Sequence, residues 1–250
     1  FTSVFGRGYG YQIWRAPRDG YAFVGMGGQL TVVLPEKELI FVINSDNQGN
    51  GSGYDILTPY VIEALEAVLA PETPEDTTTE APNENEYREL NDKIASLELY
   101  ALKGLPECPL AGKIDGVTYV CDENPLGMTK FSFSFGEGEG EFRYTNEQGD
   151  KVISFGINRN VFGKFPELGY SDEVGREVTT NGHTYSDAVS LRFTGNNKLQ
   201  MKVQIIDKYF GNFLATFAFV GDEAACKFTA TAENFLGKYR GEFIARRGQK

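Results

Sequence analysis

The feature that most constrains the fold is a series of short apolar–polar alternations in the second half of the chain. Residues 131–135, Phe-Ser-Phe-Ser-Phe, alternate strictly, and a period of two residues is typical of strands that bury one face. Similar segments follow at regular spacing, separated by turn residues: 141–144, 152–157, 185–193, 198–206, 212–220, 224–231 and 239–245. Residues 128–250 are therefore predicted to form an all-β domain, either a small lipocalin-like barrel or a sandwich.

Aromatic side chains would face the interior of such a barrel. They are the phenylalanines of residues 131–135 together with Phe210, Phe213, Phe217 and Phe219. They could line a cavity for an apolar ligand or fill the barrel themselves. Small barrels are more often filled by their own side chains, so we favour filling.

A change of composition divides the chain. Residues 71–85, PETPEDTTTEAPNEN, are acidic and rich in proline and threonine, and such a segment buries too little apolar surface to offset its ordering entropy. We predict a linker there. Residues 86–127 are expected to be a connector of helix and loops, with a helix at 86–102. We expect the apolar stripe of this helix to pack on a neighbouring domain, and the alternative is that it binds a partner. The stripe consists of Tyr87, Leu90, Ile94 and Leu97.

The first 70 residues predict antiparallel strands followed by one helix, which makes the whole chain α+β. Strands are expected at 9–14, 21–24, 30–34 and 39–43, where turn residues separate apolar runs. These continuous runs favour strands that are covered on both faces. The helix begins near Asp55 or Thr58 and ends at Pro71.

The strings GYGYQIW, GMGGQ and LPEKELIFVINSDNQG, in this order, resemble the C-terminal end of β-lactamase-like serine hydrolases of the class C and penicillin-binding type. The resemblance covers about residues 1–70. It implies that Met26-Gly27-Gly28 occupies the third conserved motif, and that the N–H of Gln29 belongs to the oxyanion hole. Tyr11 and Trp14 would then either line the substrate cleft or pack in the core. The later strings KVQIIDKYFGNFLATFAF and AENFLGKYRGEF resemble a β-rich C-terminal extension of bacterial proteins of this class.

This resemblance implies acyl-serine hydrolysis of an ester, amide or peptide. The nucleophile motif Ser-x-x-Lys is absent, so we expect it in a partner segment upstream of Phe1 and expect this chain to be inactive alone. The string Tyr144-Thr145-Asn146 matches the family's Tyr-x-Asn motif, but it falls downstream and beside a turn, and we interpret it as coincidence. The alternative function is a non-catalytic β domain that binds a ligand or a partner.

Composition limits the partners. A net charge of -11 argues against nucleic acid, and no run of 18 apolar residues predicts a transmembrane helix. One histidine, His183, and three widely spaced cysteines suggest no metal or other cofactor. Cys108 and Cys121 could form a disulfide or remain buried thiols. Exposed strands predict homodimer formation, and a secreted or cell-envelope location is favoured over the cytoplasm.

Overall fold

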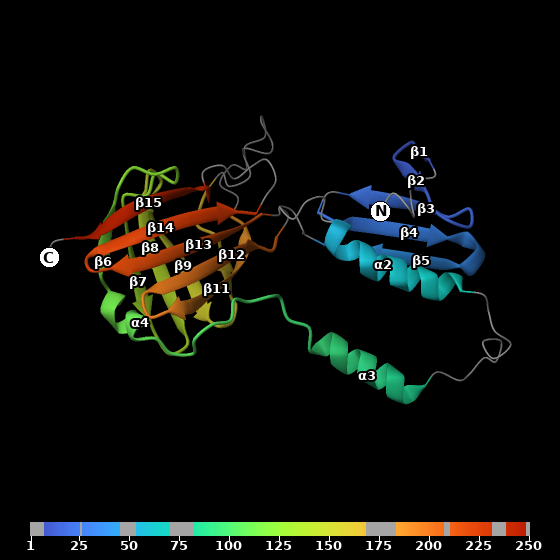
Figure 1. Cartoon of the computed structure of the whole chain (residues 1–250), viewed down its shortest axis with the longest axis horizontal. Helices are drawn as coiled ribbons and strands as arrows, with labels where there is room; N and C mark the ends of the chain where they lie inside the picture. Colours follow the sequence, from blue (N-terminus) through green and yellow to red (C-terminus); the bar gives the residue numbers. More distant parts are fainter. Residues whose placement is uncertain are drawn as a thin grey trace. The chain divides into compact units, whose positions relative to one another are not determined.

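The protein consists of two compact units, Phe1–Leu99 and Tyr100–Lys250 (Figure 1). The computed structural model describes residues 8–25, 27–45, 54–70, 83–168, 184–207, 211–231 and 239–248. The division falls at Tyr100, within the predicted connector of residues 86–127.

The first unit contains a five-stranded antiparallel sheet in the order β1-β2-β3-β4-β5. Its strands are β1 (Tyr9–Gly10), β2 (Ile13–Arg15), β3 (Tyr21–Gly25), β4 (Gln29–Leu34) and β5 (Leu39–Ile43), with a 3-10 turn, η1 (Pro35–Lys37), between the last two. Arg18 and Asp19 have positive φ angles in the β2–β3 turn, and Gly27 and Gly28 have φ of 81° and 86° before β4. Turn residues therefore set the strand order, because each connection is too short for a crossover.

Helix α2 (Tyr54–Leu69) covers one face of this sheet. Val61 and Leu65 from the helix are buried with Ala22, Leu30 and Val32 from the strands. On the other face, Phe23 is 43%, Ile40 66% and Val42 56% exposed. The prediction that both faces are covered is therefore wrong for the described residues of this unit.

Helix α3 (Glu84–Ala95) is shorter than the predicted helix and has no buried residue. The Asn83 side chain caps it by accepting hydrogen bonds from the backbone N–H groups of Asn85 and Glu86. The predicted stripe of Tyr87, Leu90, Ile94 and Leu97 is exposed. The described residues therefore do not provide the core packing that we expected for this stripe.

The second unit is a closed β-barrel of nine strands with one additional strand at its seam. The strands are β6 (Thr118–Cys121), β7 (Lys130–Phe135), β8 (Glu139–Asn146), β9 (Gly149–Ile157), β10 (Val161–Lys164), β11 (Ser186–Gly195), β12 (Lys198–Ile205), β13 (Asn212–Val220), β14 (Glu223–Ala230) and β15 (Gly241–Arg247). A short helix, α4 (Pro109–Ile114), precedes them. The predicted barrel is confirmed, and the sandwich alternative is wrong.

The barrel closes where β9 pairs with β11 in parallel, through Ser190 with Gly156 and Leu191 with Ile157. Residues 100–105, which we name the strap, reinforce this seam. Within the strap, the Leu102 N–H donates to Ser190 Oγ at 3.0 Å, and the Leu105 N–H donates to the Phe193 carbonyl at 3.0 Å. The strap therefore supplies hydrogen bonds at a junction that has few ladder pairs.

The barrel interior is filled by aromatic rings that meet from opposite walls. Phe217 on β13 lies 5.2 Å from Phe131, 5.1 Å from Phe133 and 5.5 Å from Phe142 between ring centroids. Strands β7 and β8 are not neighbours of β13 in the ring of strands, so these contacts cross the interior. The favoured prediction, a barrel filled by its own side chains, agrees with this packing.

The three cysteines are free thiols, so Cys108 and Cys121 form no disulfide. Burial raises the pKa of Cys121 to about 12 and raises that of Cys226 as well. Both thiols are therefore protonated at neutral pH, as expected of thiols in apolar surroundings.

Candidate ligand-binding pocket

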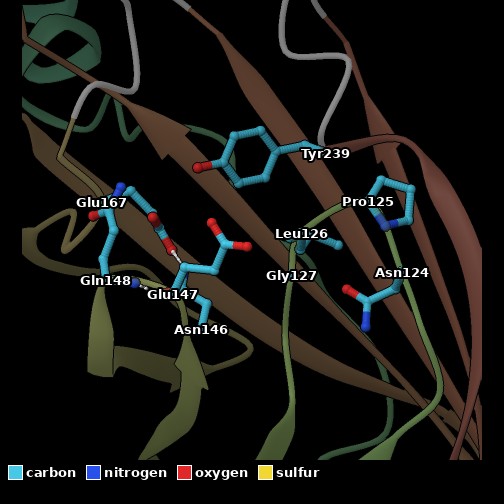
Figure 2. Close-up of a pocket in the computed structure, with 9 residues that line it drawn as sticks. All are labelled: Asn124, Pro125, Leu126, Gly127, Asn146, Glu147, Gln148, Glu167 and Tyr239. Carbon is cyan, nitrogen blue, oxygen red and sulfur yellow. Dashed lines mark hydrogen bonds between the residues drawn. The ribbon is translucent and has the colours of Figure 1, made fainter.

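A pocket of ≈ 310 Å³ lies at one end of the barrel (Figure 2). It is lined by residues of the β6–β7 loop, the β8–β9 turn and the segment after β10, and by Tyr239, two residues before β15. Its lining residues are Asn124, Pro125, Leu126, Gly127, Asn146, Glu147, Gln148, Glu167 and Tyr239. We name it the end pocket.

Glu167 is the buried polar group of the end pocket, with 4% of its surface exposed. Its Oε1 accepts a hydrogen bond from the Tyr144 hydroxyl at 2.6 Å and another from Asn146 Nδ2 at 2.8 Å. Burial raises the pKa of Tyr144 well above its usual value, and the Glu167 charge and hydrogen bond raise it further. Tyr144 is therefore held as a neutral donor that orients the carboxylate.

Hydrogen bonds fix the rim of the end pocket. Asn124 Oδ1 accepts from the Met128 N–H at 3.1 Å, which closes the β6–β7 loop. Gln148 bonds both the N–H and the carbonyl of Leu168, at 3.1 and 3.0 Å. The pocket is thus largely pre-formed, as small-molecule sites usually are.

Tyr239 joins the end pocket to the barrel core. The residue is 2% exposed, and its ring stacks on Phe213 with centroids 4.8 Å apart and an interplanar angle of 18°. Tyr239 therefore belongs both to the wall of the end pocket and to the aromatic core.

Two further hollows lie on the outer wall of the barrel. One of ≈ 380 Å³ crosses β12 to β15 and includes Ala218, Ala225 and Ile244. The other, of ≈ 220 Å³, crosses β6 to β9 and includes Lys130 and Arg143. Neither is lined by a buried carboxylate, so the end pocket is the stronger candidate.

The residues that the resemblance assigned to catalysis lie in the first unit, around the β3–β4 turn. Met26 lies outside the described residues. Gly27 and Gly28 are buried in the turn, and the Gly27 carbonyl accepts a hydrogen bond from Ser45 Oγ at 2.8 Å. Gln29 is exposed at the start of β4, opposite Gly25. Their proposed roles in an oxyanion hole are not tested by these positions and stay predictions.

The two predicted cleft residues differ in their exposure to solvent. Tyr11 is fully exposed, whereas Trp14 is half-buried and its ring lies 4.6 Å from that of Tyr9. Trp14 also packs against the sheet–helix core of the first unit. A role of either residue in a substrate cleft likewise stays a prediction.

No group of three or more metal-ligating side chains occurs among the described residues. The same part of the chain contains no helix long and apolar enough to cross a membrane. His183, the single histidine, lies outside the described residues.

Comparison with known proteins found similar solved structures but no family. No protein-family model and no curated protein matches the chain. A Schistosoma mansoni fatty acid binding protein in complex with arachidonic acid is 11% identical, with 56% of this chain and 99% of that chain covered and a TM-score of 0.39. The REP1-NXSQ fatty acid transporter is 8% identical, with 56% and 99% covered and a TM-score of 0.38. Secretory abundant heat soluble protein 4 from Ramazzottius varieornatus is 13% identical, with 48% and 69% covered and a TM-score of 0.33.

These comparisons overturn the hydrolase prediction. No β-lactamase or other serine hydrolase is among the similar structures, and no family model supports the resemblance. The prediction of a β-lactamase-related serine hydrolase is therefore wrong, and the comparisons do not support an upstream nucleophile segment as its partner. The glycine cluster that carried the resemblance has a structural role, because positive φ at Gly27 and Gly28 forms the β3–β4 turn. The β-lactamase-like domain of the fold prediction is likewise not shown by the structure.

Proposed function

We propose that the barrel unit is a non-catalytic ligand-binding domain whose ligand occupies the end pocket. The observation that carries this proposal is the buried Glu167 carboxylate at the wall of a pre-formed pocket of ≈ 310 Å³. A buried polar group that is oriented by two donors provides the directional recognition that small-molecule sites use. No reaction is required, because the pocket presents no nucleophile with an adjacent base among its described residues.

The barrel interior is a poorer candidate for the binding site. Proteins similar in structure are named as binding or transporting fatty acids. In this chain, however, Phe217 contacts rings of β7 and β8 across the barrel. Close-packed side chains leave little room for an acyl chain unless the core rearranges.

The proposal is tested by nuclear magnetic resonance on the full chain. Titration with a panel of small polar fragments should shift the backbone amide signals of Asn146, Gln148 and Glu167 in a saturable way. In parallel, oleate should leave the methyl signal of Met201, a buried residue of β12, unchanged. Saturable oleate binding that shifts Met201, without any fragment binding at the end pocket, would contradict the proposal.

A second candidate function is homodimer formation by the first unit. Strands β1 and β5 are the edges of an open sheet, and Ile40 and Val42 on β5 are 66% and 56% exposed. Exposed edges with apolar side chains favour pairing with a second copy. Light scattering at increasing concentration checks this: the native chain should dimerise, and Ile40→Lys combined with Val42→Lys should keep it monomeric.

A further inference from the structure

We propose that the end pocket selects a small organic cation. This inference deepens the function proposed above and rests on it. The acidic side chains that line the pocket are Glu147, from the β8–β9 turn, and Glu167, and none of its described lining residues is a lysine or an arginine. In Figure 2 both lie on the opposite side of the pocket from Asn124 and Pro125.

Glu167 receives no counter-charge from its hydrogen-bond donors. These donors, the Tyr144 hydroxyl and the Asn146 amide, are both neutral. Neither Glu167 nor Glu147 forms an ion pair with a described lysine or arginine. An ionised carboxylate that is buried without a counterion is unfavourable, and a cationic ligand would supply a positive charge that the described residues do not.

Lys151, a described cation near the rim, donates its hydrogen bonds to other groups. Its Nζ donates to Gln148 Oε1 at 3.2 Å and to the Pro166 carbonyl at 3.1 Å. Both acceptors are neutral oxygens, and Lys151 does not line the end pocket. Lys151 therefore supports the rim and leaves the carboxylate available to a ligand.

The end pocket is large and part of its wall is apolar. A volume of ≈ 310 Å³ corresponds to about ten water molecules, far more than a bare metal ion needs. Pro125, Leu126 and the Tyr239 ring give the wall apolar surface. An ammonium group that carries methyl or methylene groups matches both parts of this wall, because its charge meets the carboxylates and its carbons meet the apolar side chains.

Choline and its uncharged isostere 3,3-dimethyl-1-butanol form a matched pair of probes for the full chain. Choline should bind saturably and shift the amide signals of Asn146 and Glu167, whereas the isostere should bind at least about tenfold more weakly. Glu167→Gln keeps an oxygen that accepts both hydrogen bonds and removes the charge. This variant should weaken choline binding about tenfold or more.

Glu137→Gln is the control. Glu137 is exposed in the β7–β8 turn, at the opposite end of β8 from Asn146, so this variant should bind choline as the native chain does. Equal binding of the two probes, or choline binding unchanged by Glu167→Gln, would overturn the cation inference while leaving the ligand-binding proposal standing. Binding of neither probe, together with no fragment from the polar panel at the end pocket, would overturn both.

Discussion

Two buried carboxylates near the same end of the barrel have different electrostatic environments. Glu167 accepts hydrogen bonds from two side chains, whereas Asp187, at the start of β11, is 3% exposed. Burial raises the pKa of Asp187 to about 6, although the backbone N–H of Gly163, its own N–H and the charge of Lys164 act in the opposite direction. The ionised form of Asp187 is therefore disfavoured by the fold.

This pKa predicts a pH dependence of stability. Between the unfolded value near 4 and the folded value of about 6, the folded state binds more protons than the unfolded state. The contribution of Asp187 to the free energy of unfolding should therefore fall as pH rises through this window. Asp187→Asn should remove this slope and be more stable than the native chain at pH 7 by about 2–3 kcal/mol.

Urea unfolding at a series of pH values between 4 and 7 measures this difference. Asp222→Asn is the matched control, because Asp222 is an exposed residue of the β13–β14 turn with its side chain 79% accessible. The control should leave the slope unchanged. Parallel stability curves for the native chain and Asp187→Asn would contradict the role assigned to Asp187.

At the scale of elements, the strap contacts both sides of the barrel seam. Its Gly104 N–H donates to Asn158 Oδ1 at 2.7 Å, and a Cβ at this position would lie 2.4 Å from the Phe193 carbonyl oxygen. Gly104→Ala should therefore displace the strap and lower the free energy of unfolding by about 1–3 kcal/mol. Thermal unfolding followed by circular dichroism checks the loss.

Gly112, in helix α4, provides the control for this substitution. A Cβ at Gly112 meets nothing within 4 Å. Gly112→Ala should leave the stability unchanged or raise it by about 0.5–1 kcal/mol, since alanine favours a helix over glycine. If both variants were equally stable, the close approach of the strap to β11 would not contribute to closure.

Most strands of the barrel could be predicted from the sequence, because period-two alternation follows from burial of one face. In β14 exposed and buried residues alternate from Glu223 to Ala230, one residue from the predicted segment. Strand β10 was missed, because a four-residue segment containing Gly163 has little periodicity. The closure between β9 and β11 could not be predicted either, because two parallel residue pairs leave no local pattern in the sequence.

The candidate site could not be predicted, because its central residue has no local signal. Glu167 is a single acidic residue in a loop, and its burial results from contacts with β8 about twenty positions earlier. Tyr144 and Asn146 had been noted only as a coincidental Tyr-x-Asn match. In the structure both donate to Glu167, because residues two apart on a strand point to the same face.

At the scale of the whole molecule, the barrel separates its core from its candidate site. Aromatic rings hold opposite walls together along the interior, and Tyr239 stacks on this core while forming part of the end pocket. The aromatic packing of the interior therefore continues to one wall of the end pocket.

The ring packing inside the barrel predicts that removal of one ring creates an apolar cavity. Phe217 is fully buried and contacts rings on β7, β8 and β14, so Phe217→Ala should lower the free energy of unfolding by about 3–5 kcal/mol. The new apolar space should bind benzene, as engineered cavities in apolar cores do, and benzene should raise the melting temperature of this variant but not of the native chain. Phe162→Ala is the control, because Phe162 is 65% exposed on β10 and its loss should change stability by less than about 0.5 kcal/mol. Benzene binding by the native chain, detected at Met201, would show instead that the interior is already open to apolar ligands, and would return the binding site to the inside of the barrel.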